Sequence, residues 1–290
     1  MERRKFIGAS AAASVGLIAC KTSAAMPNAK ENEMTELKGN INHSACYWCY
    51  NKIPLDEFLG DLKNLGVMAI DLVGPEDWPL LKKHGIHASM CWGAGKGILQ
   101  GWNDPKLHEE LIADYGKVIP QVAEAGYTNL ICFSGNRNGM NDLVGLNNCV
   151  EGLKKILPIA EKHGVVLQME LLNSKVDHKD YMCDNTLWGV ELCRRLGSEN
   201  FKLLYDIYHM QIMEGDVIRN IQDYHQYFGH YHTGGNPGRN EINDTQELFY
   251  PAIMKAILAT GFKGHVAQEF IPTWEDKIAA LKEGVTICDV

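Results

Sequence analysis

Short apolar runs alternate with longer amphipathic segments along the chain from residue 40 onward. The short runs are rich in β-branched residues and the longer segments carry apolar residues at helical spacing, so the pattern predicts repeated strand–helix units around a parallel sheet. Glycines such as Gly85 and Gly164 stand just before the next apolar run, where a helix C-cap is expected. Eight strands are predicted, at residues 41–48, 67–73, 86–92, 128–134, 165–172, 202–208, 229–233 and 265–270.

Eight such units over residues 40–290 match the roughly 250 residues typical of a closed eight-stranded barrel. We therefore predict one α/β catalytic domain, a single (β/α)₈ TIM barrel, over residues 40–290. The competing architecture is an open doubly wound sheet. That architecture is disfavoured because no G-x-G-x-x-G nucleotide fingerprint follows the first predicted strand.

The N-terminus carries the features of an export signal. Arg3, Arg4 and Lys5 precede an apolar stretch at residues 6–19 that is too short to span a bilayer comfortably. The paired arginines resemble a twin-arginine signal, so we predict a signal peptide at residues 1–19. The alternative is a short N-terminal core helix.

The end of this stretch resembles the lipobox of bacterial lipoproteins. Residues 17–20 read LIAC, which predicts cleavage before Cys20 and lipidation of its thiol. The polar segment at residues 20–39 has no apolar periodicity and is predicted to be a flexible tether. We therefore expect an exported protein of the periplasm or cell envelope that touches a membrane only through an N-terminal lipid anchor.

Composition and charge narrow the class of protein. With 46% hydrophobic and 22% charged residues, the chain is typical of a globular domain with a large core. Its formal net charge of −8 opposes binding to phosphate backbones, and no basic cluster follows the leader, so nucleic acid is not an expected partner.

The chain has nine cysteines, which in an exported protein raises the question of disulfides. Most of them are scattered through apolar segments without a framework spacing and are predicted to be buried small hydrophobic residues. Cys46 and Cys49 form a C-x-x-C pair, for which redox or metal use stays open.

Four predicted strands end in a side chain that can bind a metal: Glu170, Asp206, His232 and Glu269. In a barrel the carboxyl ends of the strands face one shared pocket. Because a buried carboxylate is costly without a positive partner, we favour a metal ion over unrelated ion pairs. Three carboxylates and one imidazole suit Mn²⁺ or Mg²⁺ better than a metal that prefers thiolates. One divalent metal ion is therefore the expected cofactor.

Further residues are expected to contact a substrate. His209 lies just beyond the sixth predicted strand and is expected to hydrogen-bond a substrate oxygen, with a plain surface histidine as the alternative. Arg239, in the loop after the seventh strand, is expected to bind a carboxylate or hydroxyls, and a loop-stiffening ion pair with Glu241 is the alternative. On the first predicted strand, His43, Tyr47 and Trp48 are expected to line the pocket, with a core role as the alternative for at least one of them.

Several motifs resemble the hydroxypyruvate isomerase family, within the wider superfamily of xylose isomerase-like barrels that also holds ketose 3-epimerases, inosose-processing enzymes and endonuclease IV. The motifs are MELLN at 169–173, YDIYHMQ at 205–211, PGRNE at 237–241, YPAI at 250–253 and QEF at 268–270. By this resemblance Glu170, Asp206, His232 and Glu269 match the family's metal ligands, and Glu170 and Glu269 also match its acid/base pair. Histidine at position 232 resembles the pattern of the sugar epimerases, so the assignment to a subfamily stays open.

The resemblance implies a metal-dependent isomerase. A glutamate removes the proton beside a carbonyl, an enediolate forms, and the proton returns. Return to the neighbouring carbon gives isomerisation, as of hydroxypyruvate to tartronate semialdehyde, whereas return to the opposite face of the same carbon gives epimerisation, as in a ketose 3-epimerase.

Export favours a carbohydrate-derived substrate over an intracellular metabolite. A non-catalytic sugar-binding barrel is the second alternative. An endonuclease is the weakest, because its family uses several metals and a basic groove. The expected partner is a small-molecule substrate, and a homo-oligomer is left open.

Overall fold

Eight parallel strands form the inner wall of the protein, of which a computed structural model describes residues 36–290. The strands are β1 (Asn42–Ala45), β2 (Ala69–Val73), β3 (His87–Cys91), β4 (Asn129–Cys132), β5 (Val166–Glu170), β6 (Phe201–Asp206), β7 (Phe228–Thr233) and β8 (His265–Gln268). They pair in the order β1-β8-β7-β6-β5-β4-β3-β2. A parallel bridge between Cys46 and Asp71 joins the two outer strands, so the sheet closes into a barrel.

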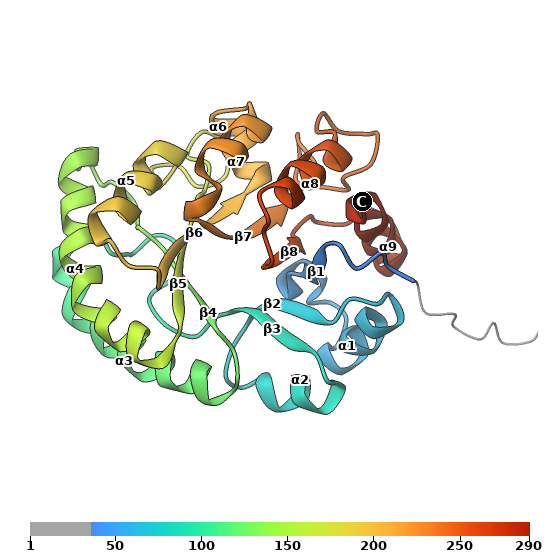
Figure 1. Ribbon diagram of the computed structural model, residues 1–290, viewed down its shortest axis with the longest axis horizontal. Helices are drawn as coiled ribbons and strands as arrows, with labels where there is room; N and C mark the ends of the chain where they lie inside the picture. Colours follow the sequence, from blue (N-terminus) through green and yellow to red (C-terminus); the bar gives the residue numbers. More distant parts are fainter. Residues whose placement is uncertain (1–35) are drawn as a thin grey trace, which may run out of the picture. The chain divides into compact units, whose positions relative to one another are not determined.

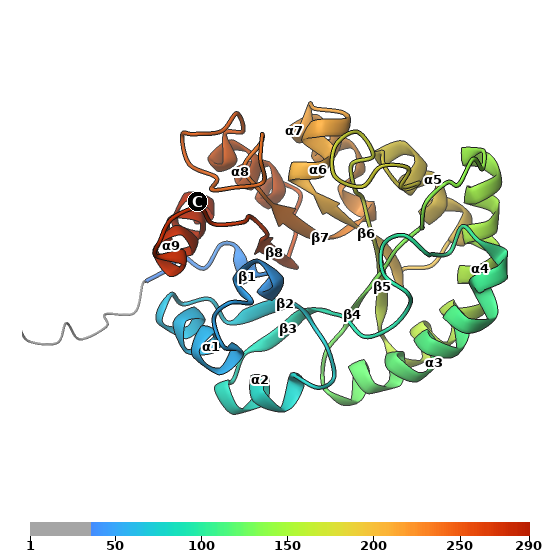
Figure 2. The same ribbon diagram turned by 180° about the vertical axis from the view of Figure 1, so that it is seen from behind.

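Helices cover the outside of the barrel, as the two opposite views in Figure 1 and Figure 2 show. They are α1 (Leu55–Asn64), α2 (Trp78–His84), α3 (His108–Glu124), α4 (Asp142–His163), α5 (Thr186–Leu196), α6 (Ile207–Met213), α7 (Val217–Tyr224), α8 (Tyr250–Ala259) and α9 (Lys277–Cys288). Short 3₁₀ helices lie in the connections, namely η1 (Tyr47–Tyr50), η2 (Pro105–Leu107) and η3 (His225–Tyr227). Within residues 36–290, no helix combines the length and apolar character needed to cross a membrane.

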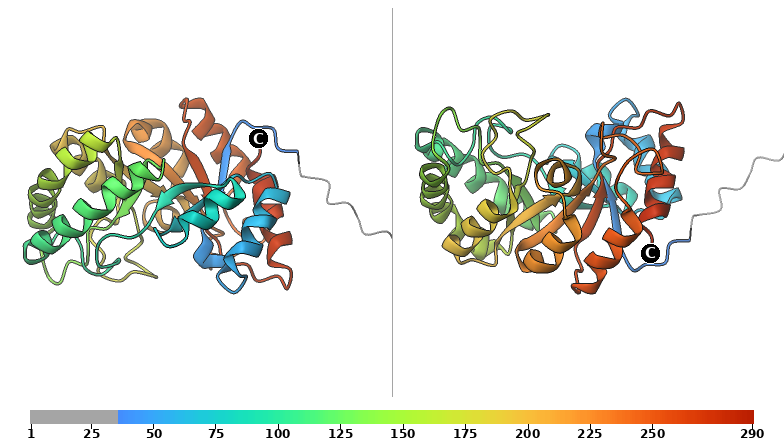
Figure 3. Two further views of the ribbon diagram at one scale, coloured as in Figure 1. Left: turned by 90° about the horizontal axis from the view of Figure 1, so that it is seen from below. Right: turned by 90° about the horizontal axis from the view of Figure 1, so that it is seen from above.

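Local side-chain chemistry sets where these helices begin and end. Asn141, Asn185 and Asp276 stand at the N-caps of α4, α5 and α9, where each side chain accepts a hydrogen bond from a backbone N–H of the first turn. Gly85 and Gly164 end α2 and α4 in the left-handed conformation that the sequence predicted for them. The long helices α3 and α4 lie together on one side of the barrel, and α1 and α9 lie on the other (Figure 3).

Side-chain alternation along the strands gives the barrel a polar interior. On β7, His230 and His232 both reach Asp71 on β2 across the interior, whereas Tyr231 between them packs outward against Phe262 with ring centroids 4.8 Å apart. This is the two-residue period of a strand. Buried polar side chains therefore lie directly beneath the mouth of the barrel, which prepares it to hold charged groups.

The predicted single (β/α)₈ barrel is confirmed, and each predicted strand has its counterpart. Seven of the eight strands are shorter than predicted, most clearly the first, predicted at 41–48 and observed as Asn42–Ala45, whereas β7 begins one residue earlier than predicted. The first strand ends early because η1 begins at Tyr47, so Trp48 lies on a 3₁₀ helix and not on a strand. All eight cysteines of the described residues are free thiols, and Cys46 and Cys49 form no disulfide.

The predicted signal peptide at 1–19, the lipidation site at Cys20 and most of the tether at 20–39 lie outside the described residues. Export and lipid anchoring therefore stay predictions.

Candidate metal centre and active site

Four side chains meet at the carboxyl ends of neighbouring strands: Glu170 of β5, Asp206 of β6, His232 of β7, and Glu269 just after β8. All four are buried, and their donor atoms lie within 4.8 Å of one another. The Nδ1 atom of His232 is 2.8 Å from Glu269 Oε2, 3.4 Å from Glu170 Oε1 and 4.0 Å from Asp206 Oδ2. The residues predicted as metal ligands thus form one cluster, called here the four-residue centre.

Backbone geometry places these groups without a flexible loop. The register of β6 and β7 pairs Asp206 directly with His232, and the backbone N–H of Glu269 donates to Thr233 O at 3.1 Å. Asp206 is also the N-cap of α6, where its Oδ1 accepts from the backbone N–H of His209 at 3.0 Å. Capping fixes the carboxylate and leaves Oδ2 directed at the centre.

The three carboxyl groups of the centre have divergent acidities. Burial, together with the charge of Glu269, raises the pKa of Glu170 above its ordinary value and that of Asp206 well above it. Burial would raise the pKa of Glu269 too, but the charges of His232 and Arg239 outweigh burial and hold it well below its usual range. Glu269 therefore loses its proton more readily than Glu170 or Asp206.

His232 lies between acids on both sides of its ring. Its Nδ1 faces Glu269, and its Nε2 lies 3.1 Å from Asp71 Oδ2 and 3.7 Å from Cys46 Sγ. Burial disfavours a charged imidazole, but Cys46, Glu269 and Asp71 together outweigh it and raise the pKa of His232 well above its ordinary value. These acids therefore favour a proton on the ring, and a proton on Nδ1 competes with metal binding at that atom.

Arg239 supplies the positive charge that faces the centre from outside. Its guanidinium donates to Glu269 Oε2 at 2.6 Å and approaches Asp206 Oδ2 at 3.4 Å. It also lies over the rings of Trp48 and Tyr208, at 5.1 and 5.3 Å from their centroids. Burial would lower the pKa of Arg239, but the surrounding carboxylates raise it.

The loop after β7 folds back to deliver Arg239. A bridge between Gly235 and Asn240 closes the loop, and Gly235 is needed there because an added Cβ would overlap the backbone carbonyl of Glu241. The expected alternative, an ion pair between Arg239 and Glu241, does not form. Glu241 instead accepts from the backbone and hydroxyl of Thr273 at 2.6 and 2.9 Å, which ties this loop to the loop after β8.

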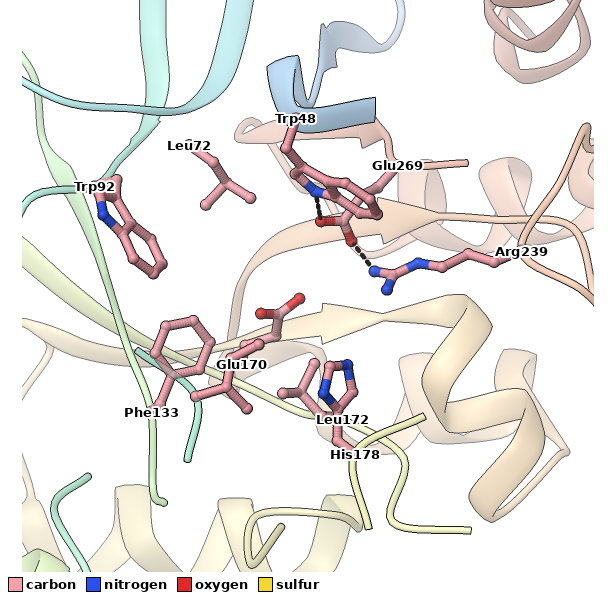
Figure 4. A pocket seen from close by; sticks show the side chains of 10 residues that line it. Trp48, Leu72, Trp92, Phe133, Glu170, Leu172, His178, Arg239 and Glu269 are labelled. Atoms are coloured by element: carbon pink, nitrogen blue, oxygen red, sulfur yellow. Dashed lines mark hydrogen bonds and ion pairs between the residues drawn. The ribbon is translucent and has the colours of Figure 1, made fainter. Parts of the chain in front are cut away.

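A cavity of about 450 Å³ opens beside the centre. In Figure 4, Glu170 and Glu269 face each other across it, and Glu269 is held by Trp48 and Arg239. Apolar and aromatic side chains form the wall away from Arg239. The lining residues are Trp48, Leu72, Trp92, Ile98, Phe133, Glu170, Leu172, His178, Arg239 and Glu269.

His209 lies directly behind the centre. Its Nδ1 is 2.6 Å from the Asn173 side-chain amide, which must donate because Asn173 Oδ1 already accepts two backbone N–H groups. Nε2 therefore carries the proton. It has no hydrogen-bond acceptor among the described residues and lies 3.6 Å from Asp206 Oδ2. Burial and the charge of Arg239 hold the pKa of His209 well below its usual range, so the ring is a neutral donor.

His43 is not brought to this site. Its neighbour Ser44 points into the barrel toward Asp71, so the two-residue strand period turns His43 outward. The imidazole lies buried against Asp289, with Nε2 3.5 Å from Oδ1. Of the three residues predicted on the first strand, Trp48 lines the cavity. Tyr47 instead packs against Phe58 with ring centroids 5.7 Å apart, and His43 lies against Asp289 at the end of the C-terminal helix.

The donor set fits a divalent metal. Three carboxylates and one imidazole from four strands provide oxygen-rich ligands with a single nitrogen. Glu170 Oε1 is buried without a hydrogen-bond partner among the described residues, which is costly unless a cation or a donor meets it. All four residues would hold the ion.

Sequence reasoning missed several residues of the site. Trp92 and Phe133 line the cavity from just beyond β3 and β4, positions where a barrel pocket was already expected. Asp71 was also missed, although an acidic residue inside the apolar run at 67–73 could have indicated it.

Comparisons with known proteins agree with this geometry. A family model described as "Xylose isomerase-like TIM barrel" matches residues 78–286. Hydroxypyruvate isomerase from Escherichia coli is 31% identical over 123 residues, which cover 42% of this chain and 47% of that protein. D-psicose 3-epimerase from Ruminiclostridium cellulolyticum is 29% identical over 124 residues, which cover 41% of this chain and 39% of that protein. The chain therefore matches less than half the length of these curated relatives.

Among solved structures, that of AP endonuclease, family 2, from Brucella melitensis has a TM-score of 0.75 at 22% identity and covers 83% of this chain and 97% of that chain. At this level of identity the likeness shows a shared fold alone.

Metal binding is predicted to release protons near neutral pH. Protons compete with the metal for Nδ1 of His232, whose pKa is raised, so metal affinity should rise as pH rises. Calorimetric titration of the metal-free protein with Mn²⁺ in buffers of different ionisation enthalpy measures the release. His232→Gln should bind more weakly and release fewer protons, whereas equal release by both proteins would contradict this role.

Loss of Arg239 is predicted to destabilise the metal-free protein. Arg239→Met leaves buried carboxylates unpaired, which typically costs about 3 kcal/mol and lowers Tm by roughly 2–4 °C per kcal/mol. Saturating Mn²⁺ should narrow the difference in Tm from the unaltered protein. The exposed pair of Arg219 with Asp216 provides the control, since Arg219→Met should change Tm little. Equal effects of both variants would show that the charge of Arg239 is not needed.

Proposed function

The chain belongs to the xylose isomerase-like TIM barrel family, and we propose that it is a divalent-metal-dependent isomerase or epimerase of a sugar-like hydroxy-carbonyl substrate. One observation carries this proposal. Glu170 and Glu269 face each other across the cavity, and both also belong to the buried donor group. Two carboxyl groups that reach one cavity from different strands can remove a proton from a bound carbon atom and return one to it.

The two glutamates are differently prepared for proton transfer. Glu269 is held at both oxygens, by the Trp48 indole N–H at 2.7 Å and by Arg239 at 2.6 Å. Glu170 has a buried oxygen without a hydrogen-bond partner among the described residues, so it is the freer of the two to accept a proton. We assign the first proton removal to Glu170. When bound, a divalent cation would polarise the substrate carbonyl and stabilise the negative charge that develops on its oxygen.

The fate of the proton decides the reaction type. Return by Glu170 to the neighbouring carbon gives isomerisation of the hydroxypyruvate isomerase type. Delivery by Glu269 to the opposite face of the same carbon gives epimerisation of the ketose 3-epimerase type. His209, a neutral donor beside Asp206, and Arg239 at the mouth would hold substrate oxygens during either reaction.

The cavity favours a substrate of sugar size. Its 450 Å³ corresponds to about 15 waters at roughly 30 Å³ each, more than twice the non-hydrogen atoms of a three-carbon hydroxy acid. Trp92 and Phe133 stand as a tilted pair with ring centroids 5.8 Å apart and provide apolar surface for the C–H face of a sugar. The second candidate, a non-catalytic sugar-binding barrel, would use the same wall but would exchange no substrate proton.

Substrate proton exchange tests the proposal. In deuterated water with Mn²⁺ or Mg²⁺, the protein should incorporate deuterium beside the carbonyl of a ketose, an aldose or a 2-keto-3-hydroxy acid. Glu170→Gln and Glu269→Gln should each slow exchange by about 100- to 10,000-fold, because each removes a proton-transfer group. Nuclear magnetic resonance or mass spectrometry measures the uptake.

Glu275→Gln provides the matched control, since Glu275 is exposed on the same loop as Glu269. It should exchange at the unaltered rate. Sugar binding without any deuterium uptake would favour the non-catalytic barrel.

We further propose that the protein is exported and lipid-anchored, which rests on Arg3, Arg4 and the LIAC motif at 17–20. Expressed in a bacterium with the export machinery, the protein should fractionate with membranes. Cys20→Ser should remove the lipid attachment site and move the protein out of the membrane fraction. Immunoblotting of the fractions checks this, and equal membrane association of both forms would contradict lipidation at Cys20.

A further inference from the structure

Asp71 is a fully buried acid on β2 that the proposed reaction does not use directly. Its Oδ1 is contacted by the hydroxyls of Ser44, at 2.6 Å, and Ser89. Its Oδ2 lies 2.5 Å from His230 Nε2 and 3.1 Å from His232 Nε2. Donors from three other strands therefore converge on one carboxylate in the barrel interior.

The contact with His232 decides which ring nitrogen is directed at the other metal ligands. A neutral imidazole carries one N–H and one lone pair, and a hydrogen bond at one nitrogen leaves the other free to bind a metal. Since Nε2 donates to Asp71, Nδ1 is the atom directed at Glu269, 2.8 Å away, and at Glu170, 3.4 Å away.

The backbone of β2 is distorted at this residue. The register with β3 slips on both sides of Asp71, and the next residue, Leu72, has a φ of 62°, a left-handed value that a leucine rarely adopts. Asp71 also forms the bridge with Cys46 that closes the barrel. Unfavourable backbone of this kind persists where the surroundings over-determine it, and it clusters at functional sites.

Cys46, Asp71 and His232 also have donor atoms within 4.8 Å of one another, which raises the question of a second metal. The hydrogen bonds argue against it. Two hydroxyls and two imidazole nitrogens already surround the oxygens of Asp71 within hydrogen-bond distance, and burial raises the pKa of the Cys46 thiol well above its ordinary value. The carboxylate acts as an acceptor and not as a ligand.

We propose that Asp71 is a positioning residue that holds His232 by its Nε2 and thereby presents Nδ1 to the metal. The inference rests on the proposed function only in assuming that the four-residue centre binds a divalent cation. Loss of such an outer carboxylate typically weakens metal binding by about 10- to 100-fold.

Metal affinity tests this role without any substrate. Calorimetric titration of the metal-free full chain with Mn²⁺ and Co²⁺ gives Kd, and the visible absorption of bound Co²⁺ reports the coordination geometry. Asp71→Asn keeps the shape of the side chain and removes its charge, and it should weaken Kd by about 10- to 100-fold and alter the Co²⁺ spectrum. Ser89→Ala is the matched control because it removes another partner of Asp71 but keeps the link to His232. It should leave Kd and spectrum close to those of the unaltered protein.

An Asp71→Asn protein of lower Tm with unaltered Kd and Co²⁺ spectrum would show a purely structural role and overturn the proposal. If the variant does not fold, ¹⁵N nuclear magnetic resonance of the unaltered Zn²⁺-loaded protein provides the test. It shows which ring nitrogen of His232 carries the proton and which binds the metal. A protonated Nε2 and a metal-bound Nδ1 support the proposal, and the reverse assignment overturns it. Turnover is not measured, so a protein that binds metal but exchanges no substrate proton would overturn the proposed function and leave this inference intact.

Discussion

The charge balance of the buried four-residue centre is the constraint on which the rest of the site depends. Three carboxylates of the four-residue centre, with Asp71 beneath them, share the interior with the cationic groups of Arg239 and His232. Burial, together with the charge of Glu269, raises the pKa values of Glu170 and Asp206, so keeping all of these acids ionised is unfavourable without a further positive charge. A doubly charged ion supplies that charge, which is why the same geometry suits metal binding and proton transfer.

The barrel meets this constraint because strand geometry is rigid and its ends are open. Register sets Asp206 beside His232, and the capping bond to α6 turns the remaining oxygen of Asp206 toward the centre. The same two-residue period that directs His230 and His232 inward turns Tyr231 into the helix layer. Core packing and site geometry are thus two consequences of one alternation.

The site residues at the strand ends were predictable from sequence, whereas side-chain orientation on the first strand and contacts across the barrel interior were not. Glu170, Asp206, His232 and Glu269 each follow an apolar run, so the barrel rule alone brings them to one mouth. His43 was misplaced because the strand phase cannot be read where the run ends in a 3₁₀ helix. Asp71 meets His232 across the barrel interior, a contact between residues 161 positions apart that no local pattern encodes.

Arg239 links the metal-free site to its working state. It donates to Glu269 Oε2, an oxygen that the donor geometry also offers to a cation. A bound ion repels the guanidinium and competes for that oxygen, so the two cannot share Glu269 on equal terms. The rings of Trp48 and Tyr208 keep the guanidinium at the cavity mouth when that contact weakens. The residue that balances the charge of Glu269 therefore also lines the cavity.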